Sequence, residues 1–394
     1  MFALEKKSEP GCVILRIAGR IESSNASSVE REIFSAMEGL DDADRLVLDA
    51  EDLAYVSSAG LRVVLRVKKA HKNTVVTNVR SDVYEIFDMT GFTEMMEIEK
   101  AYRTVDITGC EILGEGANGV VYRVGADMIV KVYRNADALE EIQKERDLAR
   151  KAFVMGVPTA IPYDVVKVGD KYGSVFEMLD ALSFAAILQR QPERVQELAK
   201  AGVDILKIIH ATKLKPGDLP DVKIEARSWV SHTEPYLKRE TFVKLRRLVE
   251  DIPDTTNMLH GDFHIKNIMR QGGENLLIDM DTLTMGHPVF ELAAIYLAYV
   301  GFSELDPTVV EKFLGIPAAL ARRFFDETMR FYFGTDDEEK LREVEKKLRV
   351  LCFTRLVRRT LNKTQATEEE KSAMLTAYVS GLEELVPTMD KLYF

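Results

Sequence analysis

The fold of this chain is decided by His260-Gly261-Asp262-Phe263-His264-Ile265-Lys266-Asn267, followed shortly by Leu276-Leu277-Ile278-Asp279-Met280-Asp281. An Asp and an Asn five residues apart, then an apolar strand ending in a second Asp, are typical of a phosphoryl-transfer site. Asp262 would orient and deprotonate a substrate hydroxyl, while Asn267 and Asp279 would hold the Mg²⁺ ions that bridge nucleotide phosphates. Mg²⁺ keeps several waters, so a few oxygen ligands from the protein suffice.

Two other interpretations of these residues stay open at this point. Asp262 can be a turn residue with Asn267 as a helix cap. Alternatively, His260, Asp262 and His264 can form a metal cluster. A phosphoryl-transfer site also demands a phosphate-binding segment upstream, and such a segment is present.

That segment is the glycine-rich run Ile112-Leu113-Gly114-Glu115-Gly116-Ala117-Asn118-Gly119-Val120-Val121-Tyr122-Arg123-Val124. Its Gly114, Gly116 and Gly119 also fit a dinucleotide-binding turn, but a helix must follow such a turn. Here the run continues with β-forming residues. It therefore predicts a β-hairpin that covers phosphates.

A lysine then follows inside the apolar strand Met128-Ile129-Val130-Lys131-Val132-Tyr133. A buried Lys is costly unless it has anionic partners, which ATP phosphates and a helix carboxylate would supply. We expect Glu145, in a predicted helix over 137–153, to be that carboxylate. Glu140 and Glu141 are expected to be solvated surface charges.

In these motifs the chain from about residue 108 onward resembles the aminoglycoside-phosphotransferase and choline-kinase-like family, relatives of the protein kinases. The resemblance implies an α+β two-lobed protein-kinase-like fold with ATP bound in the cleft. It also implies residue roles: Asp262 as catalytic base, Asn267 and Asp279 as metal ligands, Gly114, Gly116 and Gly119 over the phosphates, Lys131 on the α/β-phosphates paired with Glu145, and Glu177 with Met178 as the hinge that meets adenine through its backbone.

The sequence departs from the family pattern in two places. The metal-binding Asp lies in Asp279-Met280-Asp281 rather than Asp-Phe-Gly, which does not support an activation switch of the protein-kinase kind. Family members usually have an Asp at the position of Glu291, and the longer acid is expected to brace the catalytic loop.

Composition limits the remaining function classes. The chain has 394 residues and a net charge of −11, whereas a general nucleic-acid binder needs a basic face. The basic run 342–359 is predicted to be a solvated helix face. Three scattered cysteines without a C-x-x-C pair fit a reducing cytoplasm, and no signal-peptide core is visible at the N-terminus. The apolar run 290–302 is too short to span a membrane, so we predict a cytoplasmic protein without membrane or nucleic-acid partners.

The first hundred residues precede the kinase motifs. Along them, segments with the apolar spacing of a strand alternate with segments with the apolar spacing of a helix. Strands are predicted at 13–18, 45–49, 74–79 and 95–99, with the first ended by Gly19. Helices are predicted at 25–40, 59–71 and 82–89, with Asn25 as a cap. Such alternation indicates an α/β layer.

This part resembles the STAS family of anti-sigma-factor antagonists through Leu53-Ala54-Tyr55-Val56-Ser57-Ser58-Ala59-Gly60-Leu61-Arg62. The resemblance covers about residues 2–101 and places the phosphorylatable serine at Ser58, where the family usually has Asp before it and this chain has Ser57. Glu22 stands where an Asp is common. Ser58 is expected at the start of a helix, either as a phosphosite or only as an N-cap.

Together these observations predict an α/β STAS-like domain at 1–103, a kinase N-lobe at 108–180 and a C-lobe at 181–394. We expect an ATP- and Mg²⁺-dependent kinase for a small-molecule hydroxyl, with a regulatory domain that binds a protein partner. The alternatives are a protein Ser/Thr kinase in a partner-switching circuit and a binding protein that only senses nucleotide. Substrate choice is expected around 228–237 and 281–290.

Overall fold

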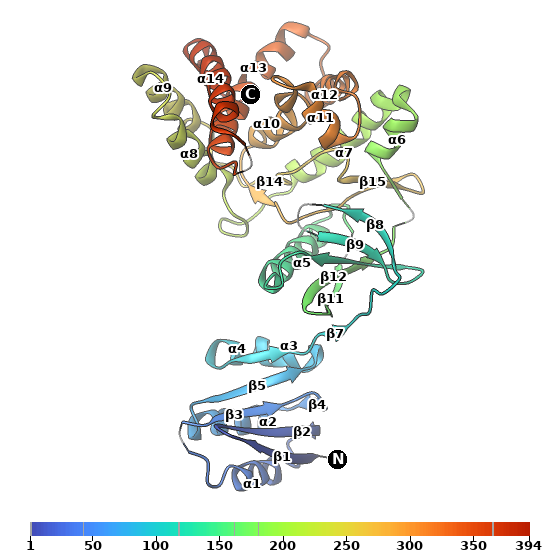
Figure 1. Cartoon of the computed structure of the whole chain (residues 1–394), viewed down its shortest axis with the longest axis vertical. Coiled ribbons are helices and arrows are strands. Elements are labelled where there is room, and N and C mark those ends of the chain that lie inside the picture. The colour runs from blue at the N-terminus through green and yellow to red at the C-terminus, as the bar shows by residue number, and fades with distance from the viewer. Residues whose placement is uncertain (1, 42, 117–118, 161, 180, 365) are drawn as a thin grey trace. The chain divides into compact units, whose positions relative to one another are not determined.

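The computed structural model describes every residue except 1, 42, 117, 118, 161, 180 and 365. Contacts divide these residues into two compact units, 1–108 with 165–173, and 109–164 with 174–394. The first unit holds the α/β layer predicted above together with residues 165–173 of the kinase N-lobe sheet, and the second holds the rest of the two lobes of a kinase-like fold (Figure 1). The predicted domain boundaries themselves stay a proposal.

The N-terminal unit is built on a mixed sheet with strand order β1-β2-β3-β5-β6, and β4 pairs with β2. Strands β1 and β2 form an antiparallel hairpin, while β2–β3, β3–β5, β5–β6 and β2–β4 are parallel. The strands are β1 (Ala3–Glu9), β2 (Cys12–Ile21), β3 (Arg45–Asp49), β4 (Leu53–Val56), β5 (Thr74–Val79) and β6 (Ile98–Lys100).

Strands β1 and β4 were not expected from the sequence, and β2 is longer than expected. Strand β1 is mostly exposed and charged, so it lacks the apolar alternation that signals a strand. Strand β2 does not end at Gly19, because the chain makes an irregularity in its pairing with β4 there and continues to Ile21. Gly19 has φ +88°, which accommodates this irregularity without steric cost.

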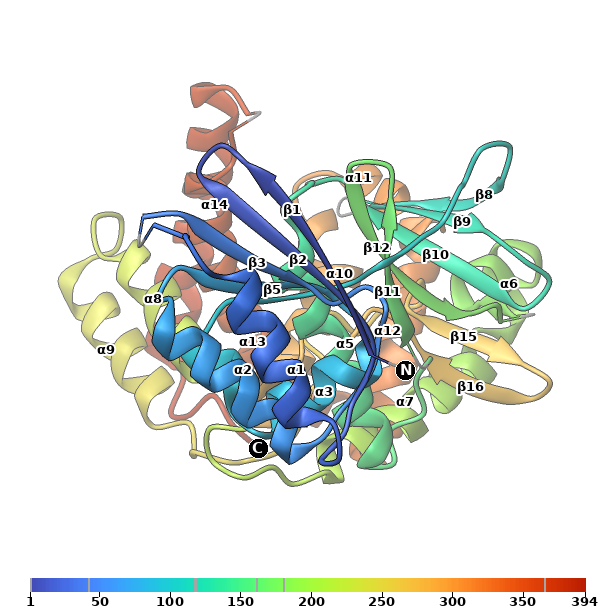
Figure 2. The same cartoon turned by 90° about the horizontal axis from the view of Figure 1, so that it is seen from below.

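Four helices cover this sheet: α1 (Ala26–Ala36), α2 (Ser58–Ala70), α3 (Ser81–Met89) and the single turn α4 (Phe92–Met95). Helices α1 and α2 pack side by side (Figure 2). Their apolar faces and the strands enclose one core that runs from Val13 to Met96. Asn25 does not cap α1 with its side chain, which instead accepts from the Glu22 amide and donates to the Arg20 carbonyl.

The kinase N-lobe is a sheet with strand order β7-β11-β12-β10-β9-β8 and the helix α5 (Leu139–Val154). The strands are β7 (Arg103–Thr104), β8 (Glu111–Glu115), β9 (Gly119–Arg123), β10 (Met128–Tyr133), β11 (Pro162–Val168) and β12 (Lys171–Glu177). Strands β8 and β9 are antiparallel neighbours, which confirms the predicted hairpin, although its residues 117 and 118 lie outside the described residues.

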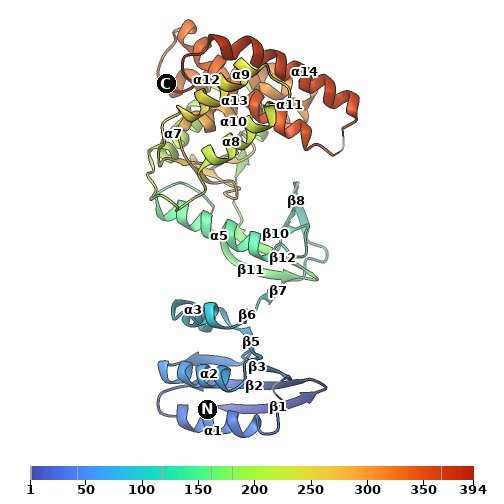
Figure 3. The ribbon, with the colours of Figure 1, turned by 90° about the vertical axis from the view of Figure 1, so that its left-hand side faces the viewer.

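The C-lobe is mainly helical and gathers its helices into one body, as Figure 3 shows. Its helices are α6 (Phe184–Arg190), α7 (Val195–Ala211), α8 (Val222–Thr233), α9 (Arg239–Glu250), α10 (Pro288–Tyr299), α11 (Pro307–Leu314), α12 (Ala318–Phe333), α13 (Glu338–Leu361) and α14 (Glu368–Leu385). Its short strands are β13 (Leu182–Ser183), β14 (Met258–Leu259), β15 (Ile268–Gln271), β16 (Glu274–Leu277) and β17 (Thr284–Met285).

Helix α13 contradicts the expectation of a solvated helix face at 342–359. It packs against α8, α10 and α14, and its middle is buried on several sides. Charged residues alternate with core residues around it, because a helix surrounded by neighbours has no single polar face. No helix among the described parts of the chain is long and apolar enough to cross a membrane.

Candidate active site

The loop 260–267 connects β14 to β15 and is shaped by Gly261. This residue has φ +84°, and a Cβ atom there would lie 2.4 Å from the carbonyl oxygen of Thr282. Only glycine allows both the left-handed backbone and this close approach. The loop is therefore held against the segment that follows Asp279.

Within this loop, Asp262 and Asn267 lie together. The Asn267 side-chain amide donates to the carbonyl oxygen of Asp262 at 3.1 Å and to its Oδ2 at 3.3 Å. His264 Nε2 lies 3.3 Å from the same Oδ2. One carboxylate oxygen is thus held by two neighbours, which orients the side chain of Asp262.

The surroundings of Asp262 keep it ionised. Burial acts to raise its pKa, but the hydrogen bond with His264 and the nearby His264, His260 and Arg355 outweigh burial and lower the pKa below its usual value. A half-buried carboxylate that stays charged and has a fixed orientation can accept a proton from a bound hydroxyl.

Asp279 is placed next to this pair by the backbone. Strand β16 ends at Leu277, two residues earlier than the strand predicted to run to Asp279. The Ile278 amide then donates to the Asn267 carbonyl at 3.0 Å, and Asp279 adopts φ +65°. A non-glycine residue in this region costs on the order of 1–3 kcal/mol, and such residues cluster at functional sites.

Lys131, on β10, reaches the same place from the other lobe. Its Nζ lies 3.0 Å from Glu145 Oε1 on α5 and 3.0 Å from Asp279 Oδ1. Tyr133 also hydrogen-bonds to the buried Glu145. Burial alone would lower the pKa of Lys131, but the Glu145 and Asp279 carboxylates raise it, so the lysine stays charged. Glu140 and Glu141 are exposed.

The glycines of the hairpin β8–β9 differ in what they do. A Cβ atom on Gly119 would lie 2.4 Å from the Val132 carbonyl oxygen, so the pairing with β10 requires glycine there. A Cβ atom on Gly114 or Gly116 would meet no atom of the described residues within 4 Å. A phosphate chain needs such clearance for close approach to backbone N–H groups.

The hinge predicted at Glu177 and Met178 lies at the end of β12. The backbone amide of Met178, expected to be available to adenine, already has a hydrogen-bond partner within the protein. The Met178 amide donates to the Asp127 carbonyl at 2.9 Å. The sole backbone donor of Met178 therefore already has a partner in the protein.

Glu291 braces the loop, and the details are visible only in the structure. It is fully buried on α10 and accepts backbone hydrogen bonds from His260 and from Gly261, the latter at 3.0 Å. Burial raises the pKa of Glu291 to about 7, although those two hydrogen bonds act to lower it.

Asp281 is a further candidate, which the sequence analysis placed only in the region 281–290 expected to choose substrate. Burial and the neighbouring Asp279 raise its pKa to about 6, which marks a locus of negative potential. The second Asp of Asp279-Met280-Asp281 was the available signal.

The alternative of a His260/Asp262/His264 metal cluster is wrong, since no group of three or more His, Cys, Asp or Glu side chains suited to a metal occurs among the described residues.

In the N-terminal unit, the N-cap of α2 is Ser57 rather than Ser58. The Ser57 hydroxyl accepts from the Gly60 amide at 3.3 Å. Ser58 is the first helical residue and is exposed, so the interpretation of Ser58 as only a cap is not supported.

Comparisons with known proteins match both parts of the chain. Residues 109–327 match the model of the phosphotransferase enzyme family, and residues 3–106 match the STAS domain, which confirms both resemblances. A curated protein of Bordetella bronchiseptica, named "Putative anti-sigma factor antagonist BtrV", is 34% identical over 92 residues, covering 22% of this chain and 78% of that protein.

Solved structures of aminoglycoside phosphotransferases are similar at low sequence identity. Aminoglycoside phosphotransferase APH(2'')-Ib bound to ADP has 13% identity and a TM-score of 0.49, covering 77% of this chain and 98% of that one. A thermostable mutant of aminoglycoside phosphotransferase APH(4)-Ia, with ADP and hygromycin B, has 13% identity and a TM-score of 0.47, covering 78% and 99%.

Proposed function

Because this chain belongs to the phosphotransferase enzyme family and carries an N-terminal STAS domain, we propose that it transfers the γ-phosphoryl group of ATP to a hydroxyl of a small molecule. The observation that carries the proposal is the convergence of Lys131, Asp262, Asn267 and Asp279 from three separate segments. Each has the chemistry that phosphoryl transfer requires at that place.

In the proposed reaction, Asp262 accepts the proton of the acceptor hydroxyl. The acceptor oxygen forms a bond to the γ-phosphorus, the bond from that phosphorus to the β-phosphate oxygen breaks, and ADP leaves. Lys131 binds the α/β-phosphates and is kept charged and oriented by Glu145. The hairpin around Gly114 and Gly116 covers the phosphates.

The residues present fit Mg²⁺. Asn267 and Asp279 offer oxygen ligands. Burial, and after it the charges of Asp279 and other carboxylates, raise the pKa of Asp281 to about 6, and a bound cation would relieve that repulsion. When bound, the ion would neutralise phosphate charge as the bond to ADP breaks.

The test of the proposed function is ATP consumption by the full chain with Mg²⁺, measured as ADP release against a panel of hydroxyl compounds. Autophosphorylation is followed in parallel, because a protein kinase would label protein, and a nucleotide sensor would bind ATP without turnover. Binding of ATP with no phosphate transferred to any acceptor or to the chain itself would contradict the proposal.

For the N-terminal unit we propose a docking surface around Ser58, regulated by phosphorylation. Its exposed position in the first turn of α2 supports this, because the positive end of the helix dipole tolerates added phosphate charge. The modification would change what docks rather than unfold the helix. Phosphopeptide mapping after incubation with Mg²⁺-ATP tests it, and Ser58→Asp and Ser58→Ala should bind a partner from native extract with different affinities.

We also propose a cytoplasmic location. The three cysteines, Cys12, Cys110 and Cys352, are all free, which fits a reducing compartment. Fractionation of the native cells tests this.

A further inference from the structure

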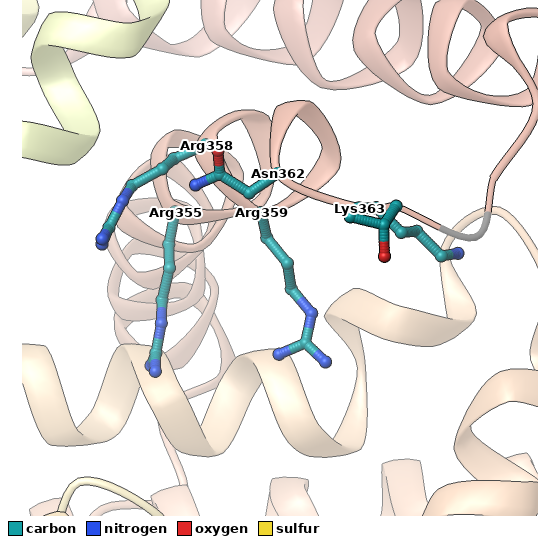
Figure 4. Close-up of a pocket in the computed structure, with 6 residues that line it drawn as sticks. Arg355, Arg358, Arg359, Asn362 and Lys363 are labelled. Atoms are coloured by element: carbon teal, nitrogen blue, oxygen red, sulfur yellow. The ribbon is translucent and has the colours of Figure 1, made fainter.

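A strongly basic pocket lies at the C-terminal end of α13 and in the turn that follows it. The cavity measures about 460 Å³ and is lined by Arg355, Arg358, Arg359, Asn362, Lys363 and Thr364. Figure 4 shows Arg355 and Arg359 extending to the same side of the helix, as their spacing of one helical turn requires.

Among the described residues, most of this positive charge has no carboxylate within ion-pair distance. Arg358 is paired with Glu225 on α8 at 2.8 Å. Throughout the described residues, by contrast, no carboxylate forms an ion pair with Arg355, Arg359 or Lys363. Two arginines one turn apart repel each other, so this arrangement weakens the free protein unless an anion joins it.

The arginines are held in place by aromatic rings instead of by carboxylates. The guanidinium carbon of Arg355 lies 5.3 Å from the ring centre of Trp229, and that of Arg359 lies 5.1 Å from the ring centre of Phe302. Stacking of this kind orients a guanidinium group while leaving its N–H donors free for a ligand.

Contacts connect this pocket to the proposed catalytic base. Phe302 packs on Phe313, whose ring centre lies 5.0 Å from that of His264, and His264 holds the carboxylate of Asp262. A second route leads from Trp229 to Phe290, the neighbour of Glu291. The charge of Arg355 also contributes to the lowered pKa of Asp262.

We propose that this pocket is the acceptor site and that it selects a hydroxyl compound bearing a phosphate or carboxylate group. The inference rests on the proposed function and names its substrate class. Guanidinium groups bind both oxyanions through paired hydrogen bonds, and free positive charges beside Asp262 repel cationic acceptors such as aminoglycosides. Trp229 lies in the region already predicted to choose substrate, and α13 adds the charge.

The experiment compares acceptors that differ only in charge, using the full chain with Mg²⁺-ATP. The pairs are glycerol 3-phosphate with glycerol, and glycerate with its amide, with kanamycin as the cationic compound. The glycerol 3-phosphate pair tests for a preference for phosphate, and the glycerate pair tests for a preference for carboxylate. We expect kcat/KM for an anionic member to exceed that of its neutral partner by about 10- to 100-fold, the effect of a charge-assisted hydrogen bond.

Variants of the pocket give the second measurement. Arg359→Gln should raise the acceptor KM by about 10- to 100-fold with kcat little changed, and Arg359→Lys should recover part of the loss. The matched control is Arg342→Gln, which removes the same charge from an exposed position of the same helix outside the pocket. Calorimetry with inorganic phosphate in saturating Mg²⁺-ADP should show binding that Arg359→Gln weakens.

The inference is overturned if kcat/KM for neutral or cationic acceptors equals that for anionic ones. It is also overturned if inorganic phosphate shows no saturable binding in the presence of Mg²⁺-ADP. A third contradicting result is that Arg359→Gln weakens nucleotide binding rather than acceptor binding. In each of these the chain still binds ATP, so the proposed phosphotransferase function survives. Failure of the full chain to bind Mg²⁺-ATP at all would instead remove both.

Discussion

Lys131 Nζ lies 3.0 Å from Oδ1 of Asp279, a residue 148 positions later in the chain. One residue belongs to the N-lobe sheet and the other follows a short C-lobe strand. This ion pair marks where phosphates and a metal would meet, because it places the lysine of one lobe on a carboxylate of the other.

Replacing this lysine should disable nucleotide binding. Lys131→Met removes the charge that the phosphates need and leaves the buried Glu145 without a cation. We expect ATP affinity to fall by about 10- to 100-fold, measured by calorimetry. The control is Lys144→Met, which removes an exposed lysine from α5. Equal effects of the two variants would remove Lys131 from the proposed site.

Asp262 and Asp279 should separate catalysis from binding. Asp262→Asn is expected to lower kcat by about 10²- to 10⁴-fold while ATP affinity stays within a few-fold, because a general base acts on the acceptor rather than on phosphate. Asp279→Ala should weaken both Mg²⁺ and nucleotide binding. Near-native turnover by Asp262→Asn would show that the proton goes elsewhere.

Glu291 should matter for stability as well as for activity. Glu291→Ala leaves the buried amide of His260 and the partly buried amide of Gly261 without this acceptor, and a buried amide left unpaired costs about 1–3 kcal/mol. Glu291→Gln keeps an acceptor and should lose much less, as urea unfolding can measure.

The pH dependence of that comparison has a defined sign. The pKa of Glu291 is raised to about 7 in the folded protein, from about 4.5 in the unfolded chain. The stability that protonated Glu291 contributes is therefore fully present below pH 4.5 and is lost as the pH rises through 7. Glu291→Gln has no charge to bury and should therefore lie closer to the wild type at pH 8 than at pH 5. The reverse order would show that the carboxylate is stabilised by its site.

His210 should make the protein sensitive to acid. It is buried on α7 and faces Tyr332 at 2.8 Å, with Glu291 at 4.0 Å and His287 nearby. Burial lowers the pKa of His210 to about 3, so its contribution is full above pH 6.5 and declines as pH falls toward 3. We expect the free energy of unfolding to fall less between pH 7.5 and pH 5 in His210→Gln than in the wild type. The difference should reach up to about 1.4 kcal/mol per pH unit. Equal slopes would contradict this.

The N-terminal unit should fold without the kinase. Its core, from Val13 to Met96, is enclosed by its own strands and helices. A fragment of residues 1–101 is expected to give a cooperative thermal transition by circular dichroism. A fragment that stays unfolded would show that the remaining segments are needed.

Much of the architecture was predictable because the signals are local. Apolar runs such as Arg45–Asp49 and Thr74–Val79 are strands with the predicted bounds, and the β-forming residues after Gly119 identify a hairpin rather than a helix. A buried lysine demands a carboxylate, and the periodicity of α5 leaves Glu145 as the one facing inward.

Other features depend on segments far apart in the sequence, so only the tertiary structure decides them. Strand β1 becomes visible through its pairing with β2, and the Met178 amide is taken by Asp127. From the sequence, the arginines of α13 look like a solvated helix face. In the structure, other helices surround α13, and Arg355 and Arg359 line one pocket. Sequence alone determined which chemical groups the proposed site has, because short motifs carry them. Packing decided which charges find partners and which stay free, because that depends on neighbours far away in the chain.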